Sequence, residues 1–158
     1  MTQPLVSELI CSLATHGFVE VSDLSTTIPD GNILLKRQTW NTNRAVVFVS
    51  PPSVPEDFSS YVRSLRKRVA FRCGFIPFFW GIGIQIIIMA PGLAETEIDP
   101  KKHIALVDNQ WAIIQSIFLV DSAARTFLSA RTWGQVVTGT FQDAIADVLT
   151  RHYGRQER

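Results

Sequence analysis

The residues with the clearest chemical potential are five cations in one short stretch: Arg63, Arg66, Lys67, Arg68 and Arg72. The stretch has helical periodicity, and the helical wheel places Arg63, Arg66 and Lys67 away from the apolar stripe. Cationic side chains gathered on one face bind phosphate oxygens, so we name these three as candidate phosphate-binding residues. A solvated helix face is the favoured interpretation of the same cations, and phosphate binding is the functional alternative. We place no aromatic side chain among them, which disfavours a stacking platform for nucleic-acid bases.

The three histidines are the remaining groups suited to general base or metal-ligand chemistry: His16, His103 and His152. They fall in separate elements, and none has a His, Cys, Asp or Glu at metal-ligand spacing. We expect them at the surface and regard only His103 as worth testing. No serine lies in a nucleophile-elbow sequence. The sequence therefore predicts no catalytic residue, no metal site and no cofactor, and it leans against an enzyme.

The segment Phe78–Met89 is the most apolar part of the chain and carries a second candidate site. With the two-residue period of a strand, one face is wholly bulky and apolar, whereas the other holds Gly81, Gly83 and Gln85. Glycines in a strand let another surface approach the backbone closely. We therefore name Gly81, Gly83 and Gln85 as residues of a ligand pocket or an interface, with the Gln85 amide as its polar handle.

The composition indicates one domain, which we place at residues 1–150, followed by a polar C-terminal tail at residues 151–158. The net charge is only +1, so only a local patch would attract nucleic acid or an anionic membrane. Cys11 and Cys73 have no CxxC spacing and are predicted to be buried free thiols. The N-terminus has no basic leader, and we expect a cytoplasmic location.

One uncharged stretch, from Cys73 to Ala94, is long enough to span a membrane. Pro77 and Pro91 lie near its ends, and the glycines and Gln85 interrupt its middle. Its apolar residues also repeat every two positions, a period that a spanning helix does not need. We therefore predict no membrane span.

Periodicity and turn signals predict an α+β domain with the order α-β-β-β-α-β-β-β-β-α. A capping box at Ser53–Glu56 is expected to begin the second helix. Most connections between strands are short, so we predict a mostly antiparallel sheet of about six or seven strands with about three helices on one face. The predicted helices are Pro4–His16, a second that follows the Ser53–Glu56 box and carries its apolar stripe from Phe58 to Cys73, and a last one opened by Thr140–Asp143. The predicted strands are Phe18–Ser22, Ile33–Trp40, Arg44–Ser50, Phe78–Met89, His103–Val107, Trp111–Val120 and Arg125–Trp133.

Helices on one face would leave the other apolar face of the sheet uncovered. Trp111–Val120 supports this view, because Ile113, Ile117 and Leu119 are expected on one face, and Ile114 and Phe118 on the other. A second copy of the chain would bury such a face most simply. The leading hypothesis is a non-catalytic, soluble homo-oligomer, in the simplest case a dimer, that serves as an interaction or adaptor domain for an unidentified protein partner.

Two alternatives remain from the same residues. The first is a small-molecule-binding or enzymatic domain with its pocket over Gly81, Gly83 and Gln85. The second is phosphate or nucleic-acid binding through the helix that contains Arg63–Arg72, with nucleic acid the less supported ligand of the two.

Overall fold

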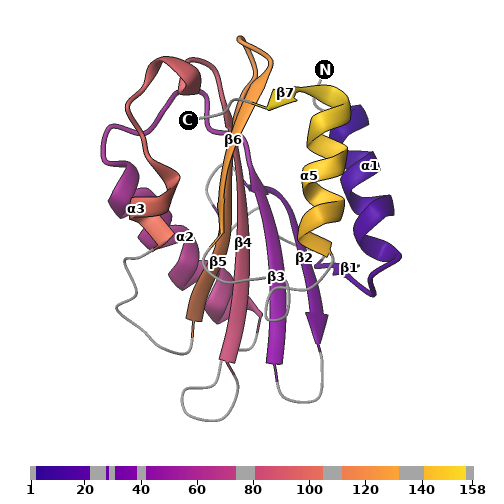
Figure 1. The fold of residues 1–158 in the computed structure, drawn as a ribbon. Helices are drawn as coiled ribbons and strands as arrows, with labels where there is room; N and C mark the ends of the chain where they lie inside the picture. The colour runs from indigo at the N-terminus through magenta and orange to yellow at the C-terminus, as the bar shows by residue number, and fades with distance from the viewer. Residues whose placement is uncertain are drawn as a thin grey trace.

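The computed structural model describes residues 3–21, 28, 31–38, 42–73, 81–104, 112–131 and 141–155. Within these residues a seven-stranded sheet lies between two layers of helices (Figure 1). The helices are α1 (Gln3–Ala14), α2 (Phe58–Arg72), the 3-10 turn η1 (Leu93–Glu95), α3 (Pro100–Ile104) and α5 (Phe141–His152). The strands are β1 (Val19–Glu20), β2 (Gly31–Gln38), β3 (Thr42–Val49), β4 (Gly81–Ala90), β5 (Ala112–Asp121), β6 (Thr126–Arg131) and β7 (Gly154–Arg155).

The sheet is mixed, and its strands lie side by side in chain order from β1 to β7. The central strands β3, β4 and β5 are parallel, whereas β2 pairs antiparallel with β3 and β6 pairs antiparallel with β5. Parallel neighbours need a crossover, and α2 and α3 provide it on either side of β4 in the sequence. The predicted α+β class is confirmed, but the prediction of a mostly antiparallel sheet is wrong.

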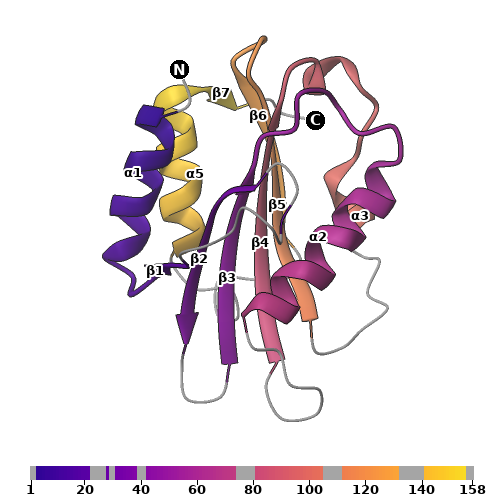
Figure 2. The ribbon, with the colours of Figure 1, turned by 180° about the vertical axis from the view of Figure 1, so that it is seen from behind.

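Helices cover both faces of the sheet. Figures 1 and 2 show α1 and α5 on one face and α2 and α3 on the other. The described residues contain four α-helices, so the prediction of about three helices on a single face is wrong. On the α2/α3 face, the core includes Val62, Leu65 and Val69 of α2 and Ile104 of α3. On the α1/α5 face, it includes Leu5, Leu9 and Leu13 of α1 and Phe141, Ile145, Val148 and Leu149 of α5.

β4 shows why two helical layers are needed. Ile84 and Ile86 pack in the α2/α3 core, while Ile87 and Met89 pack in the α1/α5 core. Every residue of β4 after Gly81 is buried. A strand buried on both faces has a nearly continuous apolar sequence, as β4 does. The premise that one sheet face needs a second copy to cover it is therefore wrong for this part of the sheet.

β5 contains a bulge at Gln115. Ile84 pairs with Ile114 but Gln85 pairs with Ser116, so Gln115 is an extra residue in the ladder. The bulge reverses the alternation of faces, because Ile114 before it and Ile117 after it lie in the same α2/α3 core. The sequence-based assignment of these two isoleucines to opposite faces is wrong for this reason. Trp111 and residues 78–80 of the predicted strands lie outside the described residues.

α2 begins one turn later than the predicted capping box. Asp57 is its N-cap, and the Asp57 carboxylate accepts a hydrogen bond of 2.9 Å from the Ser60 backbone N–H. A hydrogen bond from the Ser60 side chain, together with the one from its backbone N–H, holds the pKa of Asp57 below its usual value. At its other end, the Asn43 side chain donates to the Cys73 carbonyl oxygen, which attaches α2 to β3.

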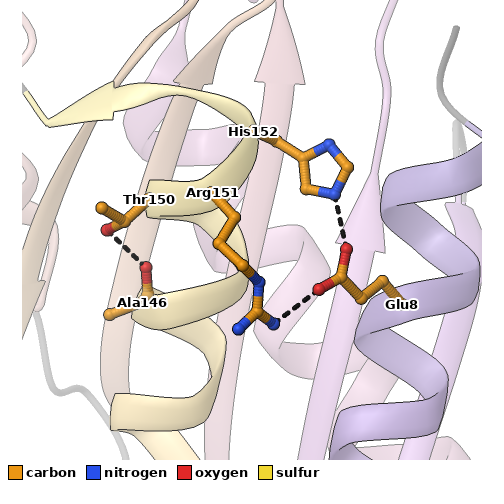
Figure 3. Close-up of polar contacts among 5 residues, drawn as sticks. All are labelled: Glu8, Ala146, Thr150, Arg151 and His152. Atoms are coloured by element: carbon orange, nitrogen blue, oxygen red, sulfur yellow. Dashed lines mark hydrogen bonds and ion pairs between the residues drawn. The ribbon is translucent and has the colours of Figure 1, made fainter.

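Ion pairs and hydrogen bonds join α1 to α5 on the other face of the sheet (Figure 3). The Glu8 carboxylate on α1 accepts from His152 Nε2 at 2.7 Å and from the Arg151 guanidinium, both on α5. The bond from His152 is the main cause that lowers the pKa of Glu8.

The predicted polar tail is partly structured. α5 continues to His152, and β7 then pairs with β6. Residues 151–155 of the predicted tail therefore carry helix and strand.

Three smaller predictions have mixed outcomes. Both cysteines are free, but Cys11 is exposed and only Cys73 is buried, where burial raises its thiol pKa to about 11. The residues predicted to begin a strand at His103 instead end the short helix α3. Among the described residues, no helix has the length and apolarity needed to cross a membrane.

Candidate functional site

A small hollow between α2 and α3 brings together residues that are far apart in the sequence. Ser59, Val62, Arg63 and Arg66 reach it from α2, His103 from α3 and Ile114 from β5; we call it the α2–α3 hollow. The four α2 residues share one stripe of that helix, because they are spaced by one, three, four or seven positions. The hollow has room for about 10 Å³, roughly one water-sized group. It would therefore hold a terminal oxygen atom of a ligand, with the rest of the ligand outside.

The polar groups of the hollow are held in place by neighbouring side chains. Ser59 Oγ lies 3.3 Å from His103 Nδ1. The His103 ring meets the Phe58 ring edge-on, with 4.8 Å between centroids. Burial lowers the pKa of His103, with Lys102 acting in the same direction and Asp99 opposing it. Burial disfavours the imidazolium, so the contact joins Ser59 Oγ to a neutral ring, and the ring tautomer decides which of the two groups donates.

The predicted phosphate-binding residues divide into two groups. Arg63 and Arg66 both line the hollow. Arg66 is only 4% exposed, so the expectation that it points away from the apolar stripe into solvent is wrong. Arg66 lies on the flank of α2 that lines the hollow together with His103 of α3 and Ile114 of β5. Lys67 is exposed and is not among the residues that line the hollow.

The charge of α2 favours an anionic ligand. The helix carries five of the fifteen lysines and arginines of the chain and has no acidic residue from Phe58 to Arg72. Two further exposed lysines, Lys101 and Lys102, lie on the adjacent α3. Guanidinium groups offer paired N–H donors that match phosphate and carboxylate oxygens, and a histidine can add a charge when protonated. The α2–α3 hollow therefore has the donor set of a site for one anionic group.

The second predicted site, around Gly83 and Gln85, is occupied by a neighbouring side chain. A Cβ atom at Gly83 would meet the Gln115 side-chain oxygen and the carbon that carries it. Gln85 Nε2 donates a 2.6 Å hydrogen bond to that same Gln115 oxygen. The close approach expected over the glycine is thus made by the bulge residue of β5. Gly81 starts β4 and is partly exposed.

The same region beneath α5 contains unused hydrogen-bonding capacity. Gln85, Ser116 and Gln142 are fully buried. Among the described residues, Gln85 Oε1, Ser116 Oγ and both polar atoms of the Gln142 amide have no hydrogen-bond partner. Such atoms are costly when buried, and they mark this layer as polar rather than purely hydrophobic. These three side chains line neither the α2–α3 hollow nor the hollow between α1 and the sheet.

The α2–α3 hollow has part of the equipment for nucleophilic catalysis. Ser59 and His103 have the relative position of a nucleophile and its base, although 3.3 Å is long for that contact. The first amides of α2 would be natural oxyanion donors, but the Asp57 carboxylate already accepts from one of them. No cluster of three metal-ligating side chains occurs in residues 3–21, 28, 31–38, 42–73, 81–104, 112–131 and 141–155. The arrangement is better suited to holding an anion than to cleaving a bond.

Sequence reasoning identified Arg63, Arg66 and His103 separately but did not join them, and it missed Ser59. The chain separation between α2 and α3 hides their proximity, which depends on the parallel order of β3, β4 and β5. No protein-family model matches the chain, and neither the curated proteins nor the solved structures include a significant match.

Proposed function

We propose that the protein binds a phosphate-bearing ligand at the α2–α3 hollow. The observation that carries this proposal is the convergence of Arg63, Arg66, His103 and Ser59 on one opening. A phosphate oxygen seated there accepts hydrogen bonds from the guanidinium groups and from the serine hydroxyl. Its negative charge also favours the protonated form of His103, which burial alone disfavours.

The proposal is a binding function without a chemical step. It sharpens the predicted phosphate-binding role of the α2 cations by moving it from the exposed helix face to the flank that meets α3. Lys67 is outside this opening, so it is not part of the proposed phosphate contact. Carboxylates have similar acceptor geometry, so a comparison of phosphate with acetate is part of the test.

Replacement of Arg63 by alanine is expected to weaken binding of inorganic pyrophosphate by about tenfold. Charge-assisted hydrogen bonds to a phosphate contribute roughly 1.5–3 kcal/mol, and the lower end applies because Arg63 is exposed. Isothermal titration calorimetry at low salt measures the change. The matched control is Arg151→Gln, which removes one exposed positive charge on α5, on the opposite face of the sheet.

Two results would contradict the proposed function. One is the absence of pyrophosphate binding to the wild-type protein at millimolar concentrations. The other is an equal loss of affinity in Arg63→Ala and Arg151→Gln, which would reduce the effect to net charge. Acetate binding as tight as pyrophosphate binding would reassign the ligand class to carboxylates.

Homo-oligomerisation stays a prediction, and so does the adaptor role that was inferred from it. Its original support, an uncovered apolar sheet face, is removed by the two helical layers. Sedimentation at high micromolar concentration tests it, and a monomer there would contradict it.

A further inference from the structure

The most exposed large apolar side chain in the described residues lies at the end of α2. Phe71 is 85% exposed. The apolar residues on the sheet-facing side of α2 are instead buried. Phe71 sits between Val69, which is fully buried, and Arg72, which is exposed. The expectation that no aromatic side chain interleaves with the α2 cations is therefore wrong. A single exposed phenylalanine is unremarkable by itself, and its surroundings give it meaning.

Phe71 belongs to a row that begins at the α2–α3 hollow. Arg63, Lys67 and Phe71 are spaced by four residues, so their side chains lie one above another along the helix. At the rise of an α-helix, this row is about 12 Å long. Arg68 and Arg72 flank it and are exposed. Arg68 Nε donates to Ser64 Oγ at 3.3 Å, which holds the Arg68 guanidinium along the helix surface. The row therefore joins the anion site to an aromatic face through a continuous strip of cations.

This combination fits a ligand that repeats a charged group and a flat apolar group. We infer that the phosphate-bearing ligand is single-stranded nucleic acid, with one phosphate at the α2–α3 hollow and a base stacked on Phe71. The inference rests on the proposed phosphate-binding function and extends it along α2. Single-strand sites elsewhere combine the same two features, a cationic track for the backbone and aromatic side chains for the bases.

A membrane surface is a poorer match to the same residues. A helix that lies in a membrane interface inserts a broad apolar face. The apolar face of α2, including Phe58, Val62 and Leu65, is instead buried against the sheet. Phe71 alone is available for insertion, whereas base stacking needs only one aromatic ring. Only an unpaired base can leave its own stack to lie on an exposed aromatic ring. The inferred ligand is therefore a single strand and not a duplex.

Replacement of Phe71 by alanine is expected to weaken binding of a fluorescent oligothymidylate of about ten nucleotides by at least fivefold. The same change is expected to leave pyrophosphate affinity unaltered. Fluorescence anisotropy at low salt measures the first quantity, and calorimetry measures the second. Because Phe71 is exposed, the variant keeps the core intact. Val19→Ala is the matched control, since Val19 is 60% exposed and lies on β1, an edge strand of the sheet.

The salt dependence tests the cationic strip separately. Three phosphate contacts would give a slope of about −2 in the logarithm of the binding constant against the logarithm of salt concentration. Lys67→Ala is expected to reduce the magnitude of that slope by about 0.7. A slope near zero in the wild-type protein would overturn the inference.

The outcomes distinguish this inference from the function on which it rests. Pyrophosphate binding with no tighter oligothymidylate binding, or with no effect of Phe71→Ala, overturns the nucleic-acid ligand and leaves the phosphate site in place. If the wild-type protein binds neither pyrophosphate nor oligothymidylate, the phosphate site and the single-strand ligand are both overturned. Equal affinity for a duplex of the same length overturns the stacked base. Phe71-dependent binding to vesicles rich in phosphatidylserine, with no binding of the oligonucleotide, overturns the inference in favour of a membrane surface.

Discussion

Replacement of Gly83 by alanine is expected to lower the free energy of unfolding by about 1–3 kcal/mol. The new Cβ atom would clash with Gln115 Oε1, so the Gln115 side chain must leave its position. Its departure breaks the hydrogen bond from Gln85 and leaves a buried amide with no partner. The end of the flexible Gln115 side chain can move aside at little cost, so the loss comes mainly from the buried unsatisfied amide, about 1–3 kcal/mol. Urea denaturation followed by circular dichroism measures the change.

A double-mutant cycle isolates the cause. Gln115→Ala alone removes the partner of Gln85 and is expected to be destabilising. In the double variant with Gly83→Ala, the alanine methyl group finds the space left by the glutamine. The combined loss should therefore fall short of the sum of the two single losses by about 1 kcal/mol or more. Strict additivity would contradict the contact between Gly83 and Gln115.

Replacement of Asp121 by alanine is expected to cost about 2–5 kcal/mol of stability. This carboxylate ends β5, is only 2% exposed, and accepts backbone N–H groups from Ala94, Ala123 and Ala124 at 2.7–2.8 Å. It thereby attaches the η1 turn to the turn between β5 and β6. Removing it leaves several donors without an acceptor in a partly buried region. Thermal and urea denaturation measure the loss.

The pH dependence of Asp121 has a defined sign. Burial raises the pKa of this carboxyl, but the backbone hydrogen bonds from Ala94, Ala124 and Ala123 outweigh it, so the pKa is lowered overall. The stability that it contributes is therefore present above about pH 3.8 and is lost as the pH falls through the folded-state pKa. Asp143→Asn is the control, because Asp143 forms a partly exposed ion pair with Arg131. Such pairs contribute no more than about 1 kcal/mol. An equal effect at both positions would contradict the structural role of Asp121.

The sequence predicts the individual elements better than their arrangement. The β2–β3 hairpin and the three long helices follow from alternation and helical periodicity, and they appear close to their predicted bounds. α3 is five residues long, which is too short for a 3.6-residue period to be visible. Without α3, the segment between β4 and β5 is interpreted as a turn followed by a short strand at His103–Val107, and antiparallel pairing is the natural but incorrect inference.

The candidate site shows the same limit more sharply. A helical wheel of α2 separates apolar from polar positions, but it does not reveal that Arg66 is buried beside the α2–α3 hollow. The bulge at Gln115 likewise shifts every later residue of β5 to the other face. Phe71 is different, because its position off the apolar stripe was visible in the sequence. A phenylalanine two positions after the apolar-stripe residue Val69 falls off that stripe, and this alone predicts an exposed ring.

His103 reports most directly on whether phosphate sits in the α2–α3 hollow. In the free protein, burial lowers the pKa of His103 below its usual value of about 6.5. The folded state therefore takes up this proton at a lower pH than the unfolded chain does. The stability contributed by the neutral ring is thus complete above about pH 6.5 and declines as the pH falls from there towards the folded-state pKa. A bound phosphate reverses this tendency, because its charge favours the imidazolium.

The decisive measurement is the pKa of His103 by NMR titration of its ring protons, with and without saturating pyrophosphate. His16 and His152 lie outside the hollow and serve as internal references. We expect a His103 pKa below about 6.5 in the free protein and a clear increase when pyrophosphate is added. A His103 pKa that does not change, or that rises only as much as those of the two reference histidines, would contradict it.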